Sequence, residues 1–298
     1  MSKRLLSLLL ICLAAISWGT TGTAMVLMNQ TLPMGTSVNP WVVSFWRMAL
    51  ASPWLLIVAG RQPHFWRWPS RQTGLAHLGM GACIAMYQVC YFCAVPLAGV
   101  AVTALVAICS SPLLIALLAA WRLGERLTSR MYGSLFLGMI GTALLVVRPD
   151  AIATRPGFLL GVLLAFGSAL AYASYAVIAK AQVVHVAPLT IAAYGFTTAT
   201  LFLLPALVWQ PPLADWFKAL PWLLYLGIVT TAIAYAIYML GLRHISATAS
   251  GIVVLLEPLT ATLIGVFFFQ EPMPLIGIMG AILLLSAIAL LTLQPKPA

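Results

Sequence analysis

Long apolar stretches separated by short polar or Pro/Gly-rich breaks dominate the hydrophobic pattern of this chain. A helix rises 1.5 Å per residue, so about 20 apolar residues cross the hydrocarbon core of a bilayer. These stretches are apolar on all sides, whereas the strands of a membrane barrel alternate over about ten residues. The pattern therefore predicts an all-α membrane protein with ten transmembrane helices, at about residues 5–28, 40–60, 73–95, 99–121, 131–147, 157–179, 188–209, 219–241, 246–269 and 274–293.

Composition excludes a soluble domain. The chain is 63% hydrophobic and 7% charged, while ordinary proteins carry about 25% charged residues. Lys3 and Arg4 precede an apolar run that is too long for a signal peptide, so we interpret it as a retained first helix. The five cysteines all fall inside apolar runs without the spacing of a zinc site, which favours buried thiols.

The positive charges are distributed unevenly between the connections. With a cytoplasmic N-terminus, eleven Lys and Arg residues lie on the cytoplasmic side and three lie outside, namely Arg148, Arg155 and Lys218. Cytoplasmic connections of membrane proteins carry an excess of Lys and Arg. We therefore expect a multi-pass protein of the inner (plasma) membrane with both termini in the cytoplasm.

The sequence carries a weak internal repeat. Pro112 precedes Glu125 by 13 residues, Pro258 precedes Glu271 by 13, and the two pairs are related by an offset of 146 residues. The same offset relates Gly81 to Gly227, Ala101 to Ala247, Leu113 to Leu259 and Leu117 to Leu263. These coincidences run from the third segment to the connection after the fourth, so they favour an internal duplication.

The duplication predicts two five-helix repeats, residues 1–150 and 151–298. Because each repeat has an odd number of helices, the two insert with opposite orientation. Inverted repeats are typical of secondary transporters, whose substrate lies near the midplane between the halves. The candidate hinges for the motion between the halves are Gly81, Pro112, Gly227 and Pro258, where helices can bend or slide.

Two ionisable residues lie well inside apolar segments, Arg47 and Glu257. A charged side chain at the bilayer centre costs at least about 2.5 kcal/mol, so such residues face a partner or a water-filled cavity. Glu257 is either a proton or ammonium site or a structural acceptor beside the Pro258 break. Arg47 is either a contact for an anionic substrate group or a structural residue, and its neighbours Trp41 and Trp46, typical of the membrane interface, favour the structural interpretation.

Polar aromatic residues recur at similar depth in several segments. A buried tyrosine hydroxyl or tryptophan N–H needs a partner, so these residues are unusual at mid-membrane. Each stripe taken singly is typical of core packing, but together the stripes favour a shared cavity for an aromatic or amphipathic ligand. The candidate binding residues are Trp18, Tyr87, Gln88, Tyr91, Tyr172, Tyr175, Tyr235, Tyr238 and Glu257.

No motif for catalysis is present. The sequence lacks a Gly-x-Ser-x-Gly elbow, a His-Glu-x-x-His pair and a P-loop. We interpret the chain as a carrier rather than an enzyme, with no cofactor, no metal and no nucleic acid. Its expected partners are the lipid bilayer, a small-molecule substrate and, as a candidate coupling ion, the proton, in a monomer or weak homodimer. His77 and His185 are expected at the surface, near helix ends.

Several motifs resemble the drug/metabolite transporter superfamily, in particular its ten-helix branch of two EamA-type repeats. The likeness covers about residues 5–293, and Gln270-Glu271-Pro272 departs from the usual Gly-Glu of that branch. The motifs that carry it are Ser17-Trp18-Gly19, Arg47, Pro112, Gly124-Glu125-Arg126, Glu257-Pro258 and Glu271.

The resemblance implies a transporter with a central cavity built mostly from the first, third, fourth, sixth, eighth and ninth segments. Many members of this superfamily are similar to exporters of amino acids, amphipathic metabolites or toxic compounds. One branch resembles an aromatic amino acid exporter, which fits the Tyr and Trp content. The expected function is therefore export of aromatic or other neutral amino acids by alternating access, with efflux of lipophilic cationic drugs as the alternative.

Overall fold

The regular structure of the chain is helical. A computed structural model describes residues 2–32, 39–62, 65, 70–146, 156–209 and 213–292. Within these residues the elements are, in order, α1 (Lys3–Gly19), α2 (Thr21–Thr31), α3 (Pro40–Gly60), α4 (Arg71–Ala98), α5 (Val100–Leu123), α6 (Ser129–Val146), α7 (Phe158–Gln182), α8 (Pro188–Leu203), η2 (Leu204–Trp209), α9 (Leu213–Leu224), η3 (Tyr225–Ile233), α10 (Ala234–Leu242), α11 (Ala247–Val254), α12 (Leu256–Phe268) and α13 (Leu275–Thr292).

Each predicted apolar segment coincides with a helix or with consecutive helices. In the described part of the chain, nine helical stretches are long and apolar enough to cross a membrane. A shorter apolar stretch, Leu275–Leu291, occupies the position of the predicted tenth segment. The predicted all-α membrane fold is confirmed, because none of the described residues forms a strand and apolar helices account for all ten segments.

Two of the membrane segments are interrupted. The first breaks at Thr20, whose hydroxyl donates to Ser17 O over 2.7 Å and lies 2.8 Å from the Tyr225 hydroxyl. The ninth breaks at Leu255, three residues before Pro258, because a proline has no N–H to donate to the carbonyl four residues earlier in a helix. By contrast, α5 runs without interruption through Pro112.

The eighth segment contains a π-helical stretch, η3, between α9 and α10. In its widened turns, side-chain hydroxyls donate hydrogen bonds to backbone carbonyl groups. The Thr231 hydroxyl donates to Leu226 O, five residues back, over 2.7 Å, and the Ser17 hydroxyl of α1 donates to Val229 O over 3.4 Å. Such stretches are rare and often lie at functional sites.

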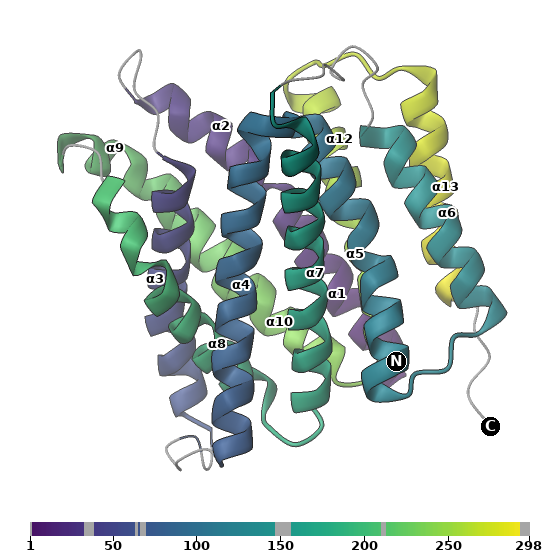
Figure 1. The fold of residues 1–298 in the computed structure, drawn as a ribbon, viewed down its shortest axis with the longest axis horizontal. Coiled ribbons are helices and arrows are strands. Elements are labelled where there is room, and N and C mark those ends of the chain that lie inside the picture. Colours follow the sequence, from purple (N-terminus) through teal and green to yellow (C-terminus); the bar gives the residue numbers. More distant parts are fainter. Residues whose placement is uncertain are drawn as a thin grey trace.

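Helices from the two ends of the chain interleave in the bundle (Figure 1). The main contacts join α4 to α7, α6 to α13, α5 to α7, α3 to α8 and α4 to α8, followed by α1 to α10. The α6–α13 pair forms one edge of the bundle in Figure 1. Its helices approach closely at Gly141, where an added Cβ would lie 2.7 Å from Gly280 O. Small residues at such crossings allow close backbone packing in membranes.

The connection between α10 and α11 is held from two sides. Glu125 accepts from Ala247 N (2.6 Å), Thr248 N (3.2 Å) and the Thr248 hydroxyl (2.9 Å). Lys180 Nζ of α7 donates to Leu242 O at the end of α10 over 2.9 Å. An anion at a helix start and a cation at a helix end both match the helix dipole. We call this arrangement of Glu125, Lys180 and the two helix ends the α10–α11 clasp.

One backbone feature recurs at the repeat offset. Glu125 N donates to Ala119 O over 3.2 Å, and Glu271 N donates to Gly265 O over 3.0 Å. Both bonds close the end of a membrane helix, α5 and α12 respectively. The two connections therefore share a local geometry, while the division at residue 150 stays a prediction.

The structure corrects one expectation for the histidines. His77, expected at the surface, is 4% exposed because α8 covers it, and its ring stacks on Tyr194 with 5.2 Å between centroids. His185 lies exposed in the connection after α7, as expected.

Candidate functional site

The bundle encloses a large cavity of about 870 Å³. Pockets for small ligands commonly measure about 300–1,000 Å³. Its walls come from α1, α2, α3, α4, α5, α6, α7, α10 and α12. The cavity extends to Gly99 and Glu271, which follow α4 and α12 at the upper end of Figure 1, opposite the start of α1.

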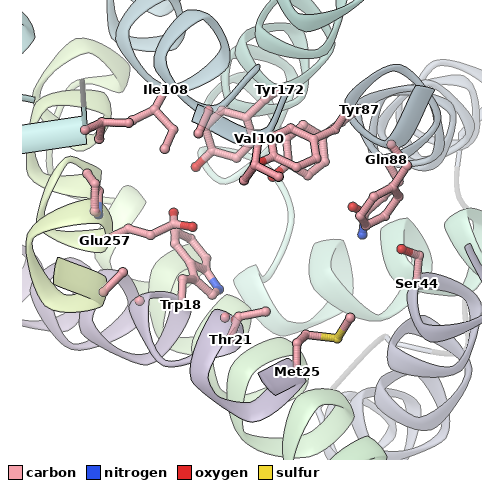
Figure 2. A pocket seen from close by; sticks show the side chains of 18 of the residues that line it. Trp18, Thr21, Met25, Ser44, Tyr87, Gln88, Val100, Ile108, Tyr172 and Glu257 are labelled. Carbon is pink, nitrogen blue, oxygen red and sulfur yellow. The ribbon is translucent and has the colours of Figure 1, made fainter. Parts of the chain in front are cut away.

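Aromatic rings form a continuous wall of this cavity. Trp18 lies 4.6 Å from Tyr235 between ring centroids, and Tyr235 lies 6.1 Å from Tyr175. Tyr87 and Tyr172, 5.9 Å apart, extend the wall on α4 and α7. These spacings fall in the range in which aromatic rings attract one another. In Figure 2, Tyr87 and Tyr172 lie across the cavity from Trp18.

Glu257 lies in the first turn of α12 and lines the cavity. Figure 2 shows its carboxylate beside the indole of Trp18. The helix break at Leu255 places Glu257 at a helix start, where backbone N–H groups and the helix dipole favour a negative charge. Gly19 allows α1 to pack directly on this turn, because a Cβ there would lie 2.7 Å from Glu257 O.

Three polar atoms of the aromatic wall are buried with no hydrogen-bond partner among the described residues. They are Trp18 Nε1 and the hydroxyls of Tyr172 and Tyr175. A buried polar group without a partner costs about 1–3 kcal/mol. All three residues line the cavity, but these three atoms lie behind its surface and are not exposed to it.

Arg47 also lines the cavity, although we interpreted it from the sequence as structural. Its Nε donates to the Thr231 hydroxyl over 3.3 Å. The sequence signal for a place at the cavity was the position of an arginine at mid-helix, and the role of Arg47 stays a prediction. Ser44, one turn earlier, and Gln88 of α4 face each other on the same side of the cavity (Figure 2).

The structure brings eight of the nine candidate binding residues to the cavity: Trp18, Tyr87, Gln88, Tyr91, Tyr172, Tyr175, Tyr235 and Glu257. Tyr238 does not line it. Its ring is fully buried behind Trp18, 5.4 Å between centroids, and its hydroxyl lies 3.3 Å from that of Ser250. Tyr238 therefore supports the wall from behind, and the binding roles of the other eight stay predictions.

The four candidate hinge residues occupy different surroundings. Pro258 lines the cavity, and Pro112 lies buried beside a smaller adjoining pocket that also contacts Glu257. Gly81 and Gly227 are sites of close helix packing, since an added Cβ would lie 2.7 Å from Ala199 N and from Leu50 Cβ respectively. Among the described residues, no three His, Cys, Asp or Glu side chains gather to hold a metal.

Comparison with known proteins identifies the family. The EamA-like transporter family matches residues 5–147 and 159–293. An uncharacterized transporter, YwfM of Bacillus subtilis, is 30% identical over 295 residues, which covers 97% of this chain and 94% of the relative. Protein PecM of Dickeya dadantii is 26% identical over 275 residues, 91% of this chain and 87% of the relative.

A solved crystal structure of a protein with 23% identity has the same fold, with a TM-score of 0.81 over 97% of both chains. The two family matches together cover nearly the whole chain. YwfM, which matches over nearly its full length, is named a transporter. The chain therefore belongs to the EamA-like transporter family and is a multi-pass membrane transporter.

Proposed function

We propose that this transporter exports small amphipathic metabolites, specifically aromatic or other neutral amino acids. The observation that carries the proposal is the cavity wall of Trp18 and Tyr side chains with one carboxylate, Glu257. Aromatic faces bind planar apolar groups, while the lining residues Arg47, Gln88 and Glu257 offer polar contacts. Such a surface suits a ligand that is apolar at one end and polar at the other.

The transport cycle in this proposal is alternating access in the inner (plasma) membrane, with both termini in the cytoplasm. Residues 1–150 and 151–298 act as inverted repeats that rock about the cavity. The break before Pro258 and the η3 stretch around Gly227 supply bends, and Gly81 allows helices to slide at close range. Pro112 is the equivalent candidate hinge in α5, which is continuous in this structure.

Transport in proteoliposomes tests the proposal. Purified protein is reconstituted, and uptake of radiolabelled tryptophan and phenylalanine is measured with and without an imposed pH gradient. We expect saturable uptake that unlabelled aromatic amino acids block. Uptake equal to that of empty liposomes contradicts the amino acid assignment and leaves the family membership intact.

Proton coupling through Glu257 is a separate prediction. The carboxylate lines the cavity at a helix start, where it can bind either a proton or the ammonium group of a ligand. We expect Glu257→Gln to carry substrate down its gradient without a response to the pH gradient. Arg122→Gln, at the exposed end of α5, is the control that keeps the response. An unchanged response in Glu257→Gln removes the coupling role.

Efflux of lipophilic cations is the second candidate function. Glu257 within an aromatic cavity favours it, because carboxylates and aromatic faces both attract cations. Uptake of a labelled lipophilic cation, measured beside uptake of labelled phenylalanine, separates the two candidates. Saturable uptake of the cation that aromatic amino acids do not block supports the cation carrier, and saturable uptake of phenylalanine that lipophilic cations do not block supports the amino acid exporter.

A further inference from the structure

We propose that Arg47 binds the carboxylate of the transported solute, so that the cavity selects zwitterions over simple cations and simple anions. This inference rests on the proposed function and names the substrate class. Arg47 and Glu257 come from different helices, α3 and α12, and both line the one cavity. The cavity therefore presents one cation and one anion to its ligand.

Arg47 is anchored by one hydrogen bond to a residue of η3. Its Nε donates to the Thr231 hydroxyl over 3.3 Å. Thr231 is fully buried and uses its own proton on Leu226 O, over 2.7 Å, so its oxygen is free to accept. This bond to η3 occupies the Nε–H of the guanidinium and leaves its two terminal amino groups.

Arg47 keeps N–H donors beyond the one that binds Thr231. Among the described residues, the bond to Thr231 accounts for the hydrogen bonding of the Arg47 side chain. A guanidinium carries five N–H donors and matches a carboxylate through two parallel bonds. An arginine fixed at Nε and exposed to a cavity is therefore a carboxylate site, and a lysine at this position would lack the fork.

The ligand of this cavity must balance two opposite charges, those of Arg47 and Glu257. A ligand with a single charge leaves one of the two poles in a low-dielectric cavity without a counter-charge, which is costly. A zwitterion supplies a carboxylate to Arg47 and an ammonium to Glu257. Apolar lining residues, including Met25, Met48 and Phe92, complete a surface for the ligand side chain. Amino acids with aromatic or aliphatic side chains meet all three requirements.

A ligand series tests this inference on the intact protein. Binding is read from thermal stabilisation in detergent, because a ligand that binds the folded state raises the melting temperature. The probes are phenylalanine, 3-phenylpropionate without the ammonium, and phenethylamine and phenylalanine amide without the carboxylate. We expect phenylalanine to bind at least tenfold more tightly than either amine, with 3-phenylpropionate between them.

Variants assign the carboxylate to Arg47. In Arg47→Met we expect phenylalanine to bind at least tenfold more weakly and phenethylamine to change less than twofold. Arg47→Lys keeps the charge and should recover part of the affinity for phenylalanine. Arg122→Gln, an exposed arginine at the end of α5, is the matched control and should bind like the parent.

Two results overturn the inference. Phenethylamine binding as tightly as phenylalanine to the parent protein excludes a carboxylate site, and this comparison holds even if Arg47 variants fail to fold. Equal losses for phenylalanine and phenethylamine in Arg47→Met show a structural role instead. Neither result bears on carriage itself, which the liposome uptake assay decides separately.

Discussion

The absence of a side chain at Gly19 sets how closely Trp18 approaches Glu257. An added Cβ at Gly19 would lie 2.5 Å from Thr260 Cβ and 2.7 Å from Glu257 O, whereas one at Gly22 meets nothing within 4 Å. We expect Gly19→Ala to lower stability by about 1–3 kcal/mol, since overpacked contacts force the backbone apart. Gly22→Ala should be neutral or stabilising. Thermal unfolding of both variants in detergent measures the difference, and equal midpoints contradict the close contact.

Residue chemistry allowed part of the site to be predicted from the sequence. Trp18 and Glu257 could be predicted as site residues, because a polar group at mid-membrane is costly unless it faces a partner or a water-filled cavity. The same reasoning applied to Arg47, but neighbouring tryptophans led us to a structural interpretation. Tyr238 shares a segment with Tyr235 yet points away from the cavity. Apolar lining residues such as Ile108 gave no signal, because lipid and cavity favour the same side chains.

At the level of elements, the α10–α11 clasp closes the end of the bundle opposite the cavity opening. Glu125 binds the first amides of α11, and a bond to a charged group contributes about 1.5–3 kcal/mol. We expect Glu125→Gln to lose most of this contribution, because a neutral amide accepts more weakly and at one oxygen. Arg126→Gln, on the exposed next residue, is the matched control. A melting temperature of Glu125→Gln equal to that of the control contradicts the clasp.

The sequence predicted the helices better than their interruptions. Continuous apolar runs of membrane length leave the backbone no alternative to helix, so all ten segments were found. Pro258 indicated a break, and the break lies three residues earlier, at Leu255. The η3 stretch and the break at Thr20 had no proline to mark them. Both depend on contacts between α1 and the eighth segment, such as Thr20 with Tyr225, and contacts across the fold are not visible in local pattern.

At the scale of the whole molecule, the described residues leave the cavity open towards one end, and the clasp holds the helices together at the other. The cavity reaches Gly99 and Glu271 at one end, and the clasp lies at the end where α1 begins. If the termini are cytoplasmic, as the charge distribution predicts, this is an outward-open arrangement. The inverted repeat predicts that the equivalent connections at Glu125 and Glu271 lie at opposite ends of the bundle. It does not predict which of the two ends is closed.

Cysteine labelling from each side of the membrane tests this arrangement. Ala101 lines the cavity towards its opening, and Thr248 is fully buried in the clasp. With an impermeant maleimide, and relative to the parent chain, we expect Ala101→Cys to react in intact cells and Thr248→Cys to stay unreactive in both cells and inverted vesicles. Weakening the clasp by Glu125→Gln should admit reagent to Thr248→Cys from the cytoplasmic side, because alternating access requires that end to open. Reaction of Ala101→Cys from the cytoplasmic side alone would reverse the predicted orientation. If Glu125→Gln leaves Thr248→Cys unreactive, the clasp is a permanent brace of the fold rather than a gate.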